Sequence, residues 1–224
     1  MAASKARIAL IHALAHSIAP VNAELDRVWP GCARMNLLDD SLSADLAAGG
    51  GGLDEAMTAR FLALAGYAIG TGADGILFTC SAFGPCIDAV ARRWPAVPVL
   101  KPNEAMIADA VRISRRIGLV ASFAPTLASM PAEFPASVTV VPVLAEGALD
   151  ALNRGDGAEH DRLAAEAARR AADDGCDAVA LAHFSLGRAA PAVERAVRVP
   201  VLTTVGSAVR LLRERVLRVR DRAA

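Results

Sequence analysis

The chain has no excess of charge of either sign, few aromatic side chains and no long apolar run. Its 24 lysines and arginines balance 24 aspartates and glutamates, so nothing in the charge favours a nucleic-acid partner. No apolar run reaches the roughly 18 residues of a membrane helix, and no signal-peptide pattern opens the chain. We therefore expect a cytoplasmic protein with no membrane partner.

Cysteine is also scarce, and its spacing excludes the common metal motifs. Cys32, Cys80, Cys86 and Cys176 form no CxxC pair and no zinc-ligand pattern. Reduced thiols are the expectation for such a chain, and we expect no metal site. Hydrophobic residues nevertheless make up 54% of the chain and aromatics only 4%, which indicates a core of alanine, valine and leucine.

The most informative stretch is Gly72 to Gly84. Its apolar segment Ile76 to Phe78 is short and bounded by turn residues, which is typical of a buried strand in a parallel sheet. Ser81 is a fair helix N-cap, and Pro85 suits the first turn of the helix that follows. Cys80 is therefore predicted at the carboxyl end of a strand, the edge where open α/β sheets bind ligands.

Two interpretations of Cys80 remain open at this point. The N–H groups at the start of the following helix would favour an anion and lower the pKa of the thiol, which suits a reactive cysteine. Free cysteine is, however, often only a small buried hydrophobe.

The same stretch occurs twice. Gly175 to Gly187 repeats the pattern of Gly72 to Gly84 at a constant spacing of 103 residues, and His183 is the partner of Cys80. Two proton-active side chains thus occupy matching positions in two related halves. Shorter matches flank them: Arg7–Leu10 with Arg116–Leu119, and Pro98–Leu100 with Pro200–Leu202.

The repeat predicts an α/β fold made of two similar lobes, each with an open parallel sheet. We expect one lobe from residues 1–113 plus the last helix, 208–224, and the other from residues 114–207. The strands are expected at Arg7–Leu14, Ala33–Leu38, Ile76–Phe78, Ala96–Leu100, Ile117–Ala121, Val138–Leu144 and Val199–Val205, with a further strand in the unit that leads to His183.

Further polar residues are predicted at strand ends. His12 ends the first strand, where it is either a ligand contact or a structural histidine. Ser122 and Thr126 follow another strand and suit a carboxylate, although N-capping explains one of them equally well. Gly49 to Gly52 follows the second strand and is either a lid over the ligand or a plain linker.

These residues resemble the aspartate/glutamate/hydantoin racemase superfamily. The resemblance rests on Ile76–Gly84, Lys101–Met106, Arg116–Thr126 and the repeated unit Asp177–Gly187, and it spans nearly the whole chain. It implies two lobes related by pseudo-two-fold symmetry, with the substrate in the cleft between them. It also implies that no metal, pyridoxal phosphate, nucleotide or other cofactor is needed.

One position departs from the family pattern. Racemases of this family usually carry a cysteine on each side of the substrate, whereas this chain has Cys80 and, at the second position, His183. The decarboxylase pattern, which has a glycine at the first position, does not fit either. Cys80 and His183 are therefore the expected catalytic pair.

The leading hypothesis is a cofactor-independent racemase or isomerase that moves a proton at the carbon next to a carboxylate or amide of a small acid. A carboxylate-bearing small molecule is the expected partner, and a homo-oligomer is left open. The expected substrate-binding residues are strand-end and turn residues of the two halves: His12, Ser81, Ala82, Ser122, Thr126, Phe184 and Ser185.

Other functions fit the same residues. Cys80 could serve a decarboxylase or other lyase, which needs a proton on one face of the substrate only, or it could be a covalent nucleophile. A non-catalytic binder of small acids is the alternative from a different class. Deuterium exchange at the α carbon separates an enzyme from a binder.

Overall fold

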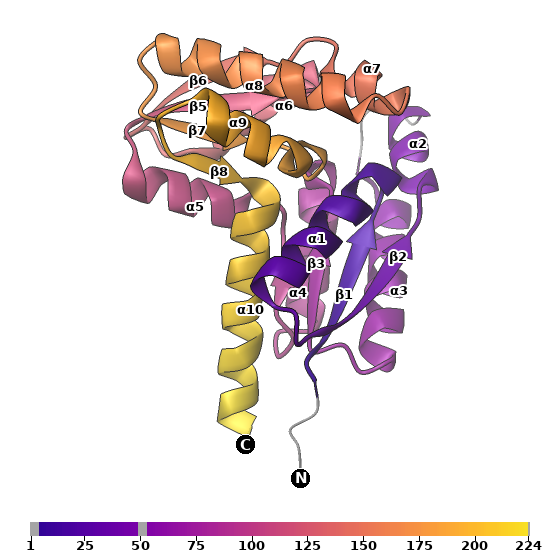
Figure 1. The fold of residues 1–224 in the computed structure, drawn as a ribbon. Helices are drawn as coiled ribbons and strands as arrows, with labels where there is room; N and C mark the ends of the chain where they lie inside the picture. Colours follow the sequence, from indigo (N-terminus) through magenta and orange to yellow (C-terminus); the bar gives the residue numbers. More distant parts are fainter. Residues whose placement is uncertain (1–4, 49–52, 224) are drawn as a thin grey trace. The chain divides into compact units, whose positions relative to one another are not determined.

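The computed structural model describes residues 5–48 and 53–223, so the Gly49–Gly52 segment lies outside the described residues. The chain divides into two compact units (Figure 1). The first unit runs up to Pro102 and resumes at Ala208, and the second runs from Asn103 to Ser207. No helix in the described part of the chain is both long and apolar enough to span a membrane.

The first unit contains a four-stranded sheet in the order β2-β1-β3-β4, in which every pair is parallel. Its strands are β1 (Arg7–His12), β2 (Ala33–Leu38), β3 (Gly75–Phe78) and β4 (Val99–Leu100). Its helical segments are η1 (Ala15–Ser17), α1 (Ile18–Val28), α2 (Ser41–Ala48), α3 (Glu55–Gly70), η2 (Ser81–Phe83) and α4 (Gly84–Arg93).

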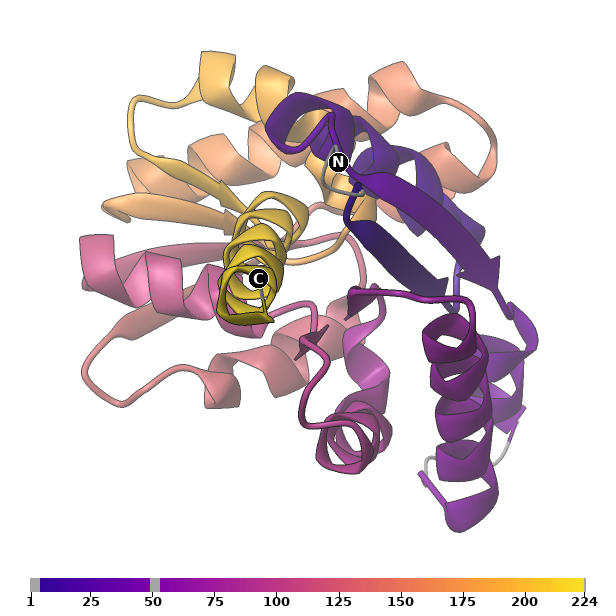
Figure 2. The ribbon, with the colours of Figure 1, turned by 90° about the horizontal axis from the view of Figure 1, so that it is seen from below.

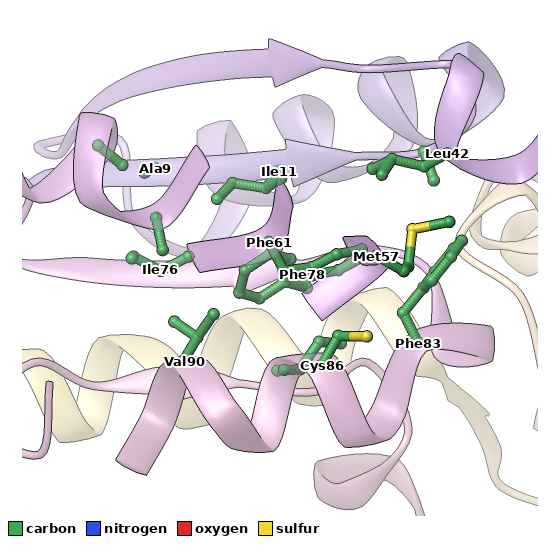
Figure 3. Packing of buried hydrophobic residues seen from close by; sticks show 14 of the residues in the cluster. Ala9, Ile11, Leu42, Met57, Phe61, Ile76, Phe78, Phe83, Cys86 and Val90 are labelled. Carbon is green, nitrogen blue, oxygen red and sulfur yellow. The ribbon is translucent and has the colours of Figure 1, made fainter. Parts of the chain in front are cut away.

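Helices α3 and α4 bury one face of this sheet. The side chains of Ile11 on β1 and Phe78 on β3 point into the same cluster as Phe61 of α3 and Cys86 of α4 (Figure 3). The rings of Phe61 and Phe78 stack with their centroids 5.3 Å apart. The chain has few aromatic residues, and three of them, Phe61, Phe78 and Phe83, belong to this one cluster beside the strand that leads to Cys80.

The second unit repeats the arrangement with the order β6-β5-β7-β8, again all parallel. Its strands are β5 (Arg116–Ala121), β6 (Thr139–Leu144), β7 (Ala178–Leu181) and β8 (Val201–Thr203). Its helical segments are α5 (Glu104–Ile113), α6 (Ala124–Ser129), η3 (Met130–Glu133), α7 (Ala148–Asn153), α8 (Gly157–Asp173), η4 (Ser185–Ala189) and α9 (Ala190–Ala196). Helix α10 (Thr204–Ala223) begins in this unit and continues into the first.

Alanine dominates the core of the second unit, as the composition predicted. Six of the clustered core residues on α7 and α8 are alanines, and they let the helices approach the sheet closely: Ala148, Ala164, Ala165, Ala167, Ala168 and Ala171. Gly118 on β5 is part of that approach, since a Cβ there would meet the Cβ of Ala171 at 2.5 Å. Only glycine fits without a shift of the helix.

The internal repeat is visible in hydrogen bonds as well as in strand order. In the first unit, Asp74 accepts from the backbone N–H of Arg7 and donates its own N–H to the Arg7 carbonyl. Asp177 makes the same two bonds with Arg116 in the second unit. The predicted α/β fold with two similar parallel sheets is thus confirmed.

The observed division between the units differs at one helix from the predicted boundary at residue 113. Helix α5 belongs with the second unit, because its Met106 and Ala110 pack against Ile117 on β5. It lies beside the first turn of α10 in both views (Figures 1 and 2), where the Ser207 hydroxyl donates to Asp109 at 2.8 Å.

Helix α2, which begins at Ser41, was not predicted from the sequence. One local prediction was wrong. Ser81 was predicted as the N-cap of the helix carrying Pro85, but a 3-10 turn intervenes and Phe83 occupies that N-cap position without a side-chain bond. Pro85 does lie in the first turn of α4.

Candidate functional site

Cys80 lies at the carboxyl edge of the first sheet, two residues after β3 ends. Its backbone is extended (φ −122°, ψ 121°), and η2 begins at the next residue. The backbone N–H of Ala82 in that turn donates to the thiol. The half-buried side chain is therefore held by the turn that follows the strand, as the sequence predicted from the Gly72–Gly84 pattern.

Burial raises the pKa of the Cys80 thiol, and the single N–H of Ala82 offsets only part of that rise. The expectation of a lowered pKa was wrong, because the helix proper begins later, at Gly84. Desolvation penalises the thiolate more than one backbone donor stabilises it. In the resting protein Cys80 is a neutral thiol and therefore a proton donor at neutral pH.

A narrow crevice of the first unit runs along the Cys80 side chain. Besides Cys80, it is lined by His12 and by five apolar residues: Ile11, Ala13, Leu42, Phe61 and Phe78. Of the lining residues, only Cys80 and His12 titrate. This apolar wall accounts for the burial that keeps the thiol neutral.

His12 ends β1 and is fully buried. Its Nδ1 lies 3.0 Å from the Thr79 hydroxyl, and its Nε2 lies 3.0 Å from Oδ1 of Asn36. The carbonyl oxygen of Asn36 can only accept, so Nε2 carries the proton and Nδ1 accepts from Thr79. Burial lowers the pKa of His12, which keeps the ring neutral. Both ring nitrogens are thus engaged within the first unit.

His183 occupies the equivalent position in the second unit, two residues after β7. The two hydroxyls predicted beside it both reach its ring. Thr126 Oγ1 lies 2.8 Å from Nε2, and Ser122 Oγ lies 3.2 Å from Nδ1. Neither hydroxyl caps α6, whose N-cap is Phe123 with no side-chain bond. The structure therefore brings these three predicted residues together.

The tautomer of His183 follows from a backbone donor. The N–H of Ser122 points at Nδ1 from 3.5 Å, and an N–H can only donate. Nδ1 is therefore the acceptor, and the proton of the neutral ring lies on Nε2, where it is donated to Thr126. Burial lowers the pKa of His183 to about 4, so the imidazole is neutral and base-competent at pH 7.

The remaining predicted residues lie in the two short 3-10 turns. Ser81 is half-buried and Ala82 exposed at the start of η2, and Ser185 is half-buried at the start of η4. Phe184 is 2% exposed, so its ring packs inside the protein.

Thr79 and Asn36 were missed by the sequence analysis. Each had a signal: Thr79 is a hydroxyl directly before Cys80, and Asn36 is an amide within the apolar strand β2. Neither signal identifies a partner, because the contact of each with His12 depends on how neighbouring strands align.

The other cysteines have less suitable surroundings. Cys86 is fully buried in α4, 3.5 Å from the Thr58 hydroxyl, and Cys176 is also buried. Cys32 is half-buried ahead of β2. Across residues 5–48 and 53–223, no three His, Cys, Asp or Glu side chains gather closely enough to hold a metal ion.

Comparison with known proteins gives one family. The family model described as Asp/Glu/Hydantoin racemase matches residues 49–212, which include both Cys80 and His183. A search of curated proteins gives no significant match.

Solved structures with the same fold are numerous but distant in sequence. Allantoin racemase from Klebsiella pneumoniae is 19% identical, with a TM-score of 0.69 over 95% of this chain and 88% of that one. An aspartate racemase homologue from Pyrococcus horikoshii is 16% identical, with a TM-score of 0.73 over 94% and 99%. A glycine-to-cysteine variant of arylmalonate decarboxylase is 20% identical, with a TM-score of 0.67 over 95% and 92%.

Proposed function

Because the chain belongs to the Asp/Glu/Hydantoin racemase family, we propose that it is a cofactor-independent racemase or isomerase. The reaction is the transfer of a proton at the carbon next to a carboxylate or amide of a small acid. Cys80 and His183 are the two acid/base groups, and the hydroxyls of Ser122 and Thr126 bind the substrate beside His183.

One observation carries this proposal. A neutral thiol and a neutral imidazole occupy equivalent places in two repeated units, each after the third strand in chain order. A neutral thiol can give a proton and a neutral imidazole can take one. The resting protein therefore already contains one acid and one base, as racemisation through opposite faces requires.

The proton balance of the proposed reaction is simple. His183 takes the α proton at Nδ1, after the hydrogen bond from Ser122 has given way, and the C–H electron pair becomes an enolate. Hydroxyl and backbone N–H donors stabilise the developing negative charge on the substrate oxygen. The Cys80 thiol then gives its proton to the opposite face of the carbon, which leaves a thiolate and an imidazolium.

The reverse reaction begins from that thiolate–imidazolium pair. The pair and the neutral thiol–imidazole pair carry the same number of protons, so both directions depend on pH in the same way. Exchange with solvent restores the neutral pair between turnovers.

The test is incubation of the protein with candidate acids in deuterated water. Deuterium at the α carbon together with inversion supports the racemase, and the substrate panel should include amino acids, hydantoins and dicarboxylates. Binding without exchange of the α hydrogen would instead mean a non-catalytic binder of small acids.

A lyase is the second candidate, and one observation favours it. Both ring nitrogens of His183 already have partners in Ser122 and Thr126, and in a lyase the imidazole would keep both hydrogen bonds and take no proton. Cys80 would then supply a proton to one face after loss of carbon dioxide or another leaving group. Carbon dioxide release from substituted malonates, without racemisation of any acid, would favour this reaction.

A further inference from the structure

We infer that His12 is a positioning residue for Cys80, which acts through Thr79, and not a contact to the substrate. This inference rests on the proposed function only in making Cys80 a reacting group. Three side chains form what we call the strand-end clamp: Asn36 on β2, His12 on β1 and Thr79 directly after β3.

The clamp joins three neighbouring strands near their carboxyl ends. The sheet order places β1 between β2 and β3, so His12 lies in the middle and reaches one partner on each side. Both of these bonds are 3.0 Å long. Thr79 is 5% exposed and His12 is fully buried, so the bond between these two side chains is shielded from water.

The fold itself does not need this clamp, as the second unit demonstrates. At the equivalent places it carries Ala121 at the end of β5, Ala182 directly after β7 and Pro142 on β6. None of the three has a polar side chain, and yet the same parallel pairings form. The clamp belongs specifically to the unit that carries the thiol.

The consequence for Cys80 is positional. Thr79 is bonded covalently to Cys80, and His12 lines the same crevice as the thiol. Fixing the Thr79 side chain fixes the end of β3, which keeps the Cys80 sulfur within reach of the Ala82 N–H. Because both nitrogens of His12 are used by the clamp, His12 has no free nitrogen to offer to a substrate.

Three variants test this inference. His12→Leu removes both polar atoms at similar volume, Thr79→Val removes the hydroxyl from the other side, and His12→Gln retains a donor and an acceptor. The first readout is iodoacetamide alkylation of Cys80 at pH 7, with peptide mapping. Loss of the Ala82 donor raises the thiol pKa further and leaves less thiolate to react, so alkylation should slow about tenfold in His12→Leu and Thr79→Val. His12→Gln should restore the rate.

Two controls keep the result specific. Buried Cys86 should stay unlabelled in every variant, which reports an intact fold. Thr126→Val, in the second unit, should leave Cys80 alkylation unchanged. The double variant His12→Leu/Thr79→Val should be no slower than either single one, because both remove the same bond.

The kinetic readout separates positioning from binding. With a substrate found by deuterium exchange, His12→Leu should lower kcat about tenfold and leave KM within about twofold. A raised KM with unchanged kcat would make His12 a substrate contact and overturn the inference, as would unchanged or faster alkylation. The alkylation experiment needs no substrate, so it tests the role of His12 even if the proposed function is wrong. The two hypotheses can therefore fail separately.

Discussion

The two units place different proton-active side chains at equivalent positions, and the surroundings of the two side chains differ. Each unit presents this side chain two residues after the equivalent strand. Cys80 directly follows Thr79 of the strand-end clamp and has one backbone donor. His183 lies after apolar Ala182 and has two hydroxyl partners, Ser122 and Thr126. The two units thus share the position of the side chain, while burial raises the pKa of the thiol and lowers that of the imidazole, as the proposed acid and base roles require.

The largest expected effect is the loss of activity when the thiol of Cys80 is replaced. Cys80→Ser replaces the acid by a hydroxyl that hardly ionises, so α-carbon exchange should fall by about 10³-fold or more. The measurement is deuterium exchange with folding checked by circular dichroism. Cys32→Ser is the matched control and should keep wild-type exchange; equal losses in both variants would remove the special status of Cys80.

The next largest effect is expected when the imidazole of His183 is replaced. His183→Asn keeps much of the hydrogen bonding to Ser122 and Thr126 but cannot carry a proton. Inversion and α-carbon exchange should both fall by about a hundredfold, because Cys80 is a neutral thiol at pH 7 and cannot take the α proton in place of the imidazole. Chiral chromatography follows the inversion, and mass spectrometry follows the exchange. If inversion is unchanged, Cys80 works without a second base.

A stability measurement tests the burial of His183 without any substrate. Its pKa is 6.5 in the unfolded chain and about 4 in the folded one, so as pH falls below 6.5 the unfolded state binds the proton first. The free energy of unfolding should therefore drop between pH 6.5 and pH 4, by about 3 kcal/mol in total.

The matched control for this experiment is His183→Asn, which lacks the titrating group and retains His12. Urea unfolding at several pH values should give a shallower decline for the variant. Parallel curves for the two proteins would mean that the His183 ring is solvated and that its base-competent state has another origin.

The smallest expected effect distinguishes the two hydroxyls that hold His183. Thr126→Val removes the sole partner of Nε2, whereas Ser122→Ala leaves the backbone N–H of residue 122 on Nδ1. A single hydrogen bond of this kind contributes about 0.5 to 1.5 kcal/mol. Thr126→Val should therefore reduce both stability and kcat more than Ser122→Ala, as thermal unfolding and turnover measurements can show. The opposite order would contradict the tautomer assigned to His183.

Patterns within single strands were enough to predict the scaffold. The bounds of β2 were predicted as observed, and the spacing between Cys80 and His183 correctly matched the two repeats. Helix α2 was missed because Asp39, Asp40 and Ser41 are typical of a turn and the eight residues of the helix form only a weakly amphipathic pattern.

The candidate site was predicted less completely, for a physical reason. Residue types and strand ends identified Ser122, Thr126 and His183 as site residues, because strand ends meet at one edge of a parallel sheet, but the hydrogen bonds of the two hydroxyls to the His183 ring were not predicted. The pKa direction of Cys80 was wrong because it depends on how much apolar surface covers the sulfur. That quantity comes from Phe61, Phe78 and other residues distant in sequence.

The division of the chain also has a consequence for the order in which the protein can fold during synthesis. The first unit lacks the segment from Ala208 onward until the ribosome has passed the whole of the second unit. Gly75 on β3 leaves space for that segment, since a Cβ there would meet Val216 at 2.6 Å. The second unit is contiguous and needs nothing downstream of Ser207. Translation therefore completes the second unit before the thiol-bearing first unit receives the segment that begins at Ala208.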